Sequence, residues 1–456
     1  MKKISMIFLM FICLIMLIFT GCEEVGITPG IENASIGNQE NSNNNNSSND
    51  PSINDTESNN YQDSSTEPIN ETNTVNPSTD DSGTDGTGDP VANEPANPGT
   101  NDPVDPGTND SMDPDAIRPQ NWATGDGTAS NPWANDCIQK AYDAASVGST
   151  IFLQEGYYQL SSTVSFDKEI HFIGEGIDKT IIMTSNARGF QVNANNCVLK
   201  GFTVDGAAQS SGSHQCINIT QANYLLLENI KVKNAGYYGI NMNDSNYCTF
   251  KNIYAHGNYR HGVHAGANIS SSNQSNSYSR IYSWDNQVNG FDDRGGLDSK
   301  NNSYDNLECW GNGIFGIVIA HIDGGELTNS KAYSNHDVGI VLSDVDSFNI
   351  DNCSSTSNVE HGIEINTSSS INLINSIVKN NYSGIIIDNT STINVISCES
   401  YDDRDSPLQK WGLELTAISG NINLSNCNFS PNKDGEIYDP AGIATKTYTN
   451  KILAKL

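Results

Sequence analysis

A short phrase of polar and apolar residues recurs along the second half of the chain. It consists of an asparagine, three further residues, a glycine and an apolar residue, and its asparagines are Asn258, Asn286, Asn312, Asn335, Asn358 and Asn380. With one altered copy on each side, the glycines follow one another at intervals of 23, 28, 26, 23, 23, 22 and 28 residues from Gly239 to Gly412. The first and third residues after each glycine are apolar in most copies, which is the period of two of a β-strand. A repeat this short cannot hold a crossover helix and two strands, so the pattern predicts a solenoid of short strands.

A second set of residues recurs with the same period between the glycines, at equivalent positions of successive repeats. We call such a set a column, and the members of this one are Asn229, Asn252, Ser279, Asn306, Asn329, Asn352, Asn375, Ser397 and Asn426. We expect the asparagines of this column to hydrogen-bond along the solenoid axis, as amides do in stacked sheets. The neighbouring residues are small, namely Ser330, Cys353, Ser376, Cys398 and Cys427. Their regular place in a narrow interior predicts packed thiols rather than disulfide bridges.

This repeat resembles that of the pectate-lyase-like superfamily of right-handed parallel β-helix proteins. The resemblance implies an all-β fold, a single-stranded right-handed parallel β-helix, over residues 151–456. About ten or eleven turns are expected between Ile151 and Tyr438. The superfamily contains lyases, epimerases, hydrolases and proteins without activity, so the resemblance predicts a fold and leaves the activity to be argued from a site.

The start of the domain also resembles that superfamily. Asp126-Gly127-Thr128, an apolar stretch near 138–145 and then Gly148 are similar to its N-terminal entry. We therefore expect residues 116–150 to form a cap. A short capping helix over about 133–145, begun by Pro132, would cover strand edges at the open end of the coil.

The first residues of the chain predict export. Lys2 and Lys3 precede an apolar run over residues 7–19, which is of signal-peptide length and short for a membrane span. The run ends in Gly21-Cys22, which resembles the lipobox of bacterial lipoproteins and implies cleavage of residues 1–21 and a lipid on Cys22. An ordinary secretory signal is the alternative. The lipobox reading predicts a protein anchored on the extracellular face of a bacterial membrane.

Residues 22–115 have the composition of a tether. Residues 23–115 hold twenty acidic side chains and no Lys or Arg, among many Asn, Ser, Thr, Pro and Gly residues. Such a segment buries too little apolar area to offset its chain entropy, so we expect it to be disordered and extended. It carries about two-thirds of the net charge of −31, and no basic patch suggests a nucleic acid as partner. We expect a monomer whose partners are the membrane and an acidic polysaccharide.

The outward positions of the predicted solenoid place two reactive side chains together. If the first and third residues after each glycine point inward, His264 and Asp292 point outward on neighbouring turns, about 4.8 Å apart. The same two turns have the longest loops after the glycine, containing residues 267–277 and 294–303. Because insertions in repeat proteins gather on the binding face, this coincidence predicts a functional site. Asp293 stands where other turns bury Ile or Leu.

Removal of the proton beside the carboxylate of a uronic acid needs a positioned base and neutralisation of the carboxylate charge. The candidate bases are His261, His264, Arg260 and Lys300, of which Lys300 also serves as a candidate substrate contact. Arg294 or Arg260 would face the carboxylate. Calcium is the alternative neutralising group, and its candidate ligands are Asp292, Asp293 and Asp298.

Two partial family matches bear on this chemistry. The segment from Tyr238 to Asp244 is similar to the Tyr-Gly-x-Asp-Pro-His-Glu segment of mannuronan epimerases, and residues 260–262 are similar to their Arg-His-Gly segment. This similarity implies that Tyr238 and Asn241 contact substrate. However, Asn241 and Asn243 stand where those enzymes have Asp and His. Separately, residues 289–292 resemble part of the calcium segment of one family of pectate lyases, whose first two acids are missing here.

Each of these residues also has a structural explanation. The histidines can be solvated surface groups, the aspartates are common in Asn/Gly-rich turns, and the arginine side chains can lie along the coil. The sequence therefore leaves two functions open. We expect a lyase or epimerase acting on a uronate-containing polysaccharide, and the alternative is a non-catalytic surface module that binds glycan or mediates adhesion.

Overall fold

The computed structural model describes residues 115–440, apart from 185–187, 207–213, 267–271, 297 and 418–419. The expected signal peptide, Cys22 with its lipid and nearly all of the tether lie outside the described residues and stay predictions. Within the described part, no helix combines the length and the apolar character needed to cross a bilayer.

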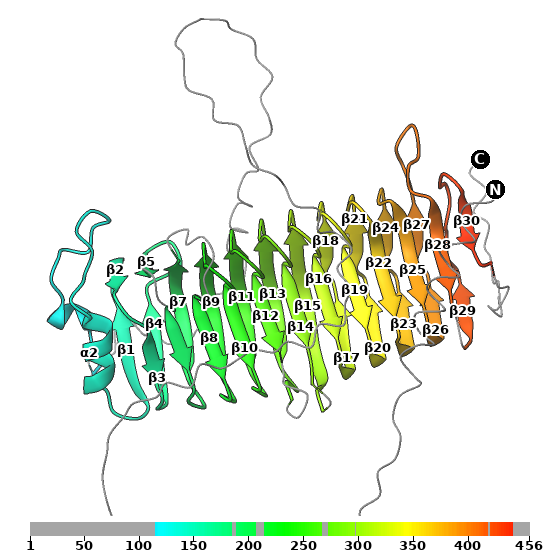
Figure 1. The fold of residues 1–456 in the computed structure, drawn as a ribbon. Helices are drawn as coiled ribbons and strands as arrows, with labels where there is room; N and C mark the ends of the chain where they lie inside the picture. The colour runs from blue at the N-terminus through cyan, green and yellow to red at the C-terminus, as the bar shows by residue number, and fades with distance from the viewer. Residues whose placement is uncertain are drawn as a thin grey trace, which may run out of the picture. The chain divides into compact units, whose positions relative to one another are not determined.

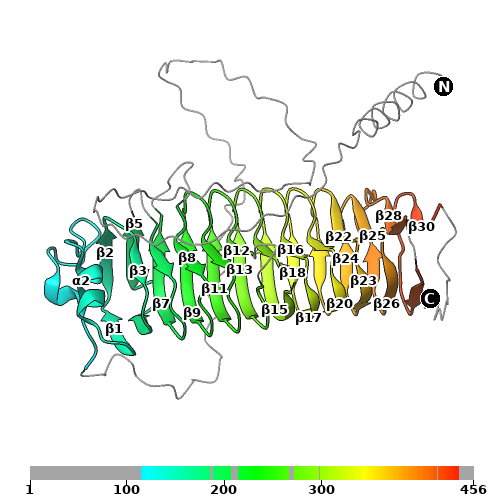
Figure 2. The same ribbon diagram turned by 60° about the horizontal axis from the view of Figure 1, so that its bottom comes forward.

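The described chain coils into a right-handed parallel β-helix of about twelve turns, as the resemblance implied (Figure 1). Its strands form one sheet of 12 strands and a second of 18 strands. The expected ten or eleven turns are slightly too few, because the first turns of the 12-stranded sheet lack the asparagine-glycine phrase that was counted. Figure 2 shows the turns stacked side by side along the coil.

The 12-stranded sheet carries the candidate site. Its strands, in spatial order, are β3 (Val164–Phe166), β6 (Phe190–Val192), β8 (Ile217–Thr220), β10 (Ile240–Asn243), β12 (Val263–Gly266), β14 (Phe291–Arg294), β16 (Ile317–Ala320), β19 (Ile340–Ser343), β22 (His361–Asn366), β25 (Ser383–Asp388), β28 (Trp411–Thr416) and β30 (Gly435–Tyr438).

The 18-stranded sheet forms the rest of the wall. Its strands are β1 (Ser149–Leu153), β2 (Gly156–Leu160), β4 (Ile170–Gly174), β5 (Thr180–Thr184), β7 (Val198–Asp205), β9 (Leu226–Lys233), β11 (Thr249–His256), β13 (Ser277–Trp284), β15 (Lys300–Trp310), β17 (Asp323–Thr328), β18 (Lys331–Tyr333), β20 (Asp346–Asp351), β21 (Ser354–Thr356), β23 (Ser369–Ile374), β24 (Ile377–Lys379), β26 (Ser391–Ile396), β27 (Glu399–Tyr401) and β29 (Ile422–Ser425).

The predicted alternation of inward and outward residues is confirmed. In β25, Ile385 and Ile387 are fully buried while Ile386 between them is partly exposed, and the corresponding residues of most other strands of this sheet behave in the same way. One consequence is that outward side chains of successive turns stand in register. His264 pairs with Asp292 on one side and with Asn241 on the other.

The buried amide ladder is formed by the other asparagine column. Asn286 Nδ2 donates to Asn312 Oδ1 at 3.0 Å, and Asn312 Nδ2 donates in turn to Asn335 Oδ1 at 3.0 Å, with all three side chains buried. In the last copy Asn381 takes this place instead of Asn380, since that repeat is one residue shorter.

The column expected to form the ladder lies instead at a bend of the coil. Its members adopt left-handed backbone conformations, as at Asn252 (φ 54°), and they bond to each other only in part, as from Asn352 to Asn329 at 2.7 Å. Asparagine suits this position because it tolerates positive φ. Arg280 occupies the column where Ser279 was expected, because residue 279 pairs with Lys251.

The cap contains one helix, α2 (Cys137–Ala144), and a single 3-10 turn, Pro119–Trp122. The helix begins later than expected because Trp133 pairs with Tyr158 instead. Its face of Cys137, Ile138, Ala141 and Tyr142 packs on the core at one end of the coil (Figure 1). All eight cysteines of the described domain are free thiols and seven are buried, in line with the expected packed column.

Candidate functional site

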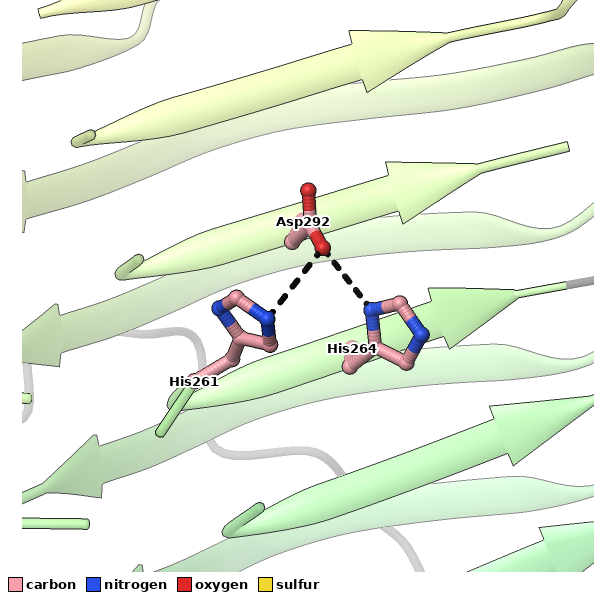
Figure 3. A group of neighbouring side chains, drawn as sticks. All are labelled: His261, His264 and Asp292. Atoms are coloured by element: carbon pink, nitrogen blue, oxygen red, sulfur yellow. Dashed lines mark hydrogen bonds and ion pairs between the residues drawn. The ribbon is translucent and has the colours of Figure 1, made fainter. Parts of the chain in front are cut away.

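His264 and Asp292 face each other across adjacent strands on the outside of the 12-stranded sheet. Each is the second residue of its strand, β12 and β14, and the two are register partners. His264 Nδ1 lies 2.9 Å from Asp292 Oδ2 (Figure 3). Because an ionised carboxylate only accepts hydrogen bonds, Nδ1 donates the proton of this bond, and Nε2 is the acceptor nitrogen of the neutral form of the ring.

His261 approaches the same carboxylate from the residue that precedes Gly262. Its Nε2 lies 3.6 Å from Asp292 Oδ2, while its Nδ1 accepts a hydrogen bond from the backbone N–H of Asn289 at 3.2 Å (Figure 3). Burial keeps the pKa of His261 well below its usual value, so the ring is neutral. Both nitrogens of His261 are therefore engaged, and the ring orients Asp292 rather than serving as an accessible base.

The Asp292 carboxylate contacts His261, His264 and Arg294. Its side chain is 0 % exposed, and Arg294 Nε donates to its second oxygen, Oδ1, at 3.0 Å. Burial works to raise the pKa of this carboxyl, but the Arg294 guanidinium and the hydrogen bond from His264 outweigh it and hold the pKa below its usual range. The carboxylate stays charged and fixes the direction of the His264 ring.

The free side of the His264 ring borders a position without a side chain. A Cβ atom on Gly266 would lie 3.0 Å from His264 Nε2 and 3.1 Å from Asn243 Oδ1. Gly266 is in register with Asn243 on β10 and with Arg294 on β14. His264 Nε2 thus lies close to Gly266 and to the Asn243 amide, and Arg294 is the register partner of Gly266 on the other side.

Two further predicted residues join this cluster. The Tyr238 ring stacks on the rings of His261 and His264, with centroids 5.1 and 4.7 Å apart. The Arg260 guanidinium lies 5.5 Å from the Tyr238 ring centroid and also bonds to the hydroxyl of Tyr237. Arg294, whose side chain is 45 % exposed, leaves part of its guanidinium open to solvent. The site therefore brings cations beside a base, as proton abstraction next to a carboxylate requires.

Two other predicted residues are not part of the hydrogen-bonded cluster around His264. Lys300 is exposed and begins β15 of the other sheet, where it pairs with Asp323. Asn241 is buried beside His264, but its amide N–H donates to Asn218 Oδ1 at 2.7 Å. Of the two long loops noted in the sequence, residues 267–271 and 297 lie outside the described residues.

The three proposed calcium ligands do not converge. Asp293 points to the interior, where its Oδ2 accepts hydrogen bonds from Tyr304 at 2.7 Å and from Asn302 at 3.1 Å. Asp292 points to the outside, because neighbouring residues of a strand alternate. Asp298 is exposed. A calcium site built on Asp292 and Asp293 together is therefore wrong, and any other use of calcium stays a prediction.

The same outer cluster could hold a different metal. One ligand atom from each of His261, His264 and Asp292 lies within 4.8 Å of the others. However, Arg294 Nε is bound to the other oxygen of Asp292, Oδ1, and brings a positive charge beside the place that a cation would take. We therefore interpret the three side chains as a hydrogen-bonded unit that orients His264.

Two residues beside His264 that were not predicted as part of the site could have been found from the repeat. Gly266 and Asn243 occupy the outward fourth position after their glycines, the same column as Arg294, so column alignment alone would have placed them together. The hydrogen bond to His261 comes from the backbone N–H of Asn289, so the residue type at position 289 does not predict it.

Family models for right-handed β-helix regions match the chain in two parts. The model described as a Pel9A-like right-handed β-helix region matches residues 116–296, and a general right-handed β-helix model matches residues 264–400 and 315–451. A comparison with curated proteins found no match.

Solved structures share the fold at low identity. The A-module of Azotobacter vinelandii mannuronan C-5 epimerase AlgE4 is 15 % identical with a TM-score of 0.59, over 72 % of this chain and 99 % of that one. The AlgE6 A-module from the same organism is also 15 % identical, with a TM-score of 0.54, over 71 % and 100 %. The Dettilon tailspike protein (gp208) is 12 % identical with a TM-score of 0.57, over 73 % and 70 %. The fold and these matches together show that the chain contains a right-handed parallel β-helix, as both family models describe.

Proposed function

We propose that this protein is a cell-surface enzyme that removes the proton beside the carboxylate of a uronic acid within a polysaccharide, as a lyase or an epimerase. The observation that carries the proposal is the hydrogen bond from His264 Nδ1 to the buried Asp292 carboxylate. In the neutral ring this bond leaves Nε2 as the acceptor nitrogen, next to Gly266 and on the same face of the sheet as Arg294.

In the proposed reaction, His264 Nε2 takes the proton from the carbon next to the sugar carboxylate. The electron pair of the broken C–H bond moves into the carboxylate, which becomes a dianion-like enediolate. Arg294 would offset this charge, and Asp292 would stabilise the imidazolium that forms. The intermediate then either expels the neighbouring glycosidic oxygen, which leaves a double bond, or regains a proton on the opposite face, which inverts the centre.

A substrate panel tests this proposal. Pectate, alginate and glycosaminoglycans would be incubated with the full chain, with absorbance near 235 nm reporting elimination and proton NMR reporting the epimer ratio. We expect one of these substrates to respond and the response to disappear in His264→Gln. His321→Gln is the matched control, because His321 Nδ1 bonds to Asp344 Oδ2 at the same 2.9 Å on the same coil, but with both side chains more than half exposed.

The alternative function, glycan binding without catalysis, is favoured by one observation. Tyr224 and Tyr247 stack with ring centroids 5.1 Å apart while 58 % and 46 % of their surface stays exposed. Exposed aromatic rings are suited to packing against sugar rings. Binding of a polyuronate without any change in absorbance or epimer ratio would support this alternative and exclude the enzyme.

The cell-surface location belongs to the proposal as well. Residues 1–22 support it through their resemblance to a lipoprotein signal and lipobox. Metabolic labelling with a fatty acid should mark the wild-type protein and leave Cys22→Ala unlabelled. Labelling of Cys22→Ala would show that the lipid, if any, is attached elsewhere.

A further inference from the structure

Gly266 is a glycine that the backbone does not require. It is absent from the residues with positive φ, so its conformation is open to any amino acid. The packing at Gly266 is tight, but less so than at Gly262 and Gly290. A Cβ on Gly262 would lie 2.0 Å from Ser283 Oγ, and one on Gly290 would lie 2.7 Å from Asn312 Nδ2.

At Gly266, the nearest atoms to an added Cβ belong only to two polar side chains. They are His264 Nε2 at 3.0 Å, Asn243 Oδ1 at 3.1 Å and His264 Cδ2 at 3.7 Å. The two distances to polar atoms are shorter than an ordinary contact, so a side chain here would push His264 and Asn243 apart. The missing side chain therefore lets the ring of the proposed base and the Asn243 amide lie close together.

Asn243 and Arg294 are the register partners of Gly266 on its two sides. Asn243 is partly exposed, and its side-chain amide makes no hydrogen bond to any other residue that the structure describes. The amide nitrogen of the neighbouring Asn241, in contrast, donates to Asn218 at 2.7 Å. The amide of Asn243 is thus available to a ligand beside His264, and it is neutral, while Arg294, two strands away, is a cation.

We propose that the reacting sugar sits against the exposed edge of the His264 ring, with its carboxylate against Arg294 and a ring hydroxyl on Asn243, so that Asn243 determines substrate specificity. This inference rests on the proposed function and adds the orientation of the sugar. The carboxylate lies toward the β14 turn, and the hydroxyl-bearing edge lies toward the β10 turn. Asn243 positions and selects the sugar but exchanges no proton with it.

Two variants test the orientation. Asn243→Asp puts a negative charge opposite Arg294, so KM for a polyuronate should rise roughly tenfold or more with little change in kcat, while a methyl-esterified polyuronate is much less affected. Gly266→Ala should lower kcat/KM about a hundredfold. Asn349→Asp makes the same charge change on an exposed side chain of the other sheet, whose oxygen can still accept from Asn372, and is expected to behave as wild type.

Equilibrium binding of hexamers of galacturonate, mannuronate and guluronate keeps the inference separate from catalysis. If wild type binds a hexamer without converting it and Asn243→Asp weakens that binding, the inference stands and the proposed enzyme fails. If wild type converts a polyuronate and Asn243→Asp has an unchanged KM, the inference is overturned while the enzyme stands. Failure of wild type to bind any hexamer overturns the inference. Misfolding of Gly266→Ala would leave Asn243→Asp to decide.

Discussion

His264 and Asp292 form a hydrogen bond of 2.9 Å across two turns of the coil, and the same bond recurs between His321 and Asp344. The two pairs differ in burial. Asp292 is 0 % and His264 15 % exposed, whereas His321 and Asp344 are 55 % and 62 % exposed. An exposed pair is screened by water, while a buried carboxylate holds one imidazole orientation firmly. Burial is thus the feature that distinguishes the proposed site from an ordinary surface pair.

Asp292→Asn tests this orienting role. An amide can donate as well as accept, so the ring would be free to adopt the other tautomer, with its proton on Nε2. We expect kcat to fall by about 10²–10⁴ while KM changes little. The fold should survive, and circular dichroism with thermal unfolding checks that. A variant as active as wild type would show that His264 needs no orienting carboxylate.

His261→Ala and His264→Ala should separate stability from chemistry. The buried His261 ring packs against Tyr238, so its removal leaves a cavity and should lower the free energy of unfolding by about 2–4 kcal/mol. Loss of His264, which is part-exposed, should cost less than about 1 kcal/mol but abolish turnover. Denaturant titration and activity assays on both variants give the comparison. If His261→Ala were as stable as the wild type but inactive, His261 would again be a candidate base.

The buried carboxyl group of Asp293 should make the free energy of unfolding depend on pH. Burial raises the pKa of its carboxyl to about 7, above the value in an unfolded chain. The folded protein therefore keeps a proton that the unfolded chain loses near pH 4, and this contribution to stability is lost as the pH rises through about 4–7. The effect should be on the order of 3–4 kcal/mol at most.

Asp293→Asn is the matched control for that titration, because the amide can still accept from Tyr304 and does not ionise. Its unfolding midpoint should vary less between pH 5 and pH 8 than that of the wild type. Equal slopes for the two proteins would place the titrating group elsewhere.

Calcium removal distinguishes two ways of neutralising the sugar carboxylate. Because Arg294 fills that role in the proposed site and Asp292 and Asp293 face opposite sides of the sheet, we expect activity to persist in excess chelator. The assay is turnover before and after treatment with EDTA, with calcium added back. Loss of activity that calcium alone restores would contradict neutralisation by arginine.

The sequence was sufficient for the coil and for the pairing at its centre. The glycine spacing sets the register, and alternation then puts His264 beside Asp292 and turns Asp293 inward. It was not sufficient for choosing between asparagine columns, because a residue type alone does not tell a buried ladder such as that of Asn312 from a bend such as that at Asn352.

The separate roles of the histidines also required coordinates. His261 and His264 are both near Asp292, and only the backbone contact from Asn289 reveals that the first ring is fully engaged. Likewise, the sequence offered four candidate bases, and the position of His264 Nε2 beside Gly266 favours His264 among them. Such distinctions depend on ring orientation, which a repeat pattern does not encode.

The most direct test follows the fate of the proton beside the sugar carboxylate. A responsive polyuronate would be incubated in D₂O, and its proton NMR signal at that carbon would be followed for the wild type, His264→Gln and His321→Gln. We expect the signal to disappear with wild type and with His321→Gln, and to persist with His264→Gln. Disappearance at the wild-type rate with His264→Gln would show that another group takes the proton.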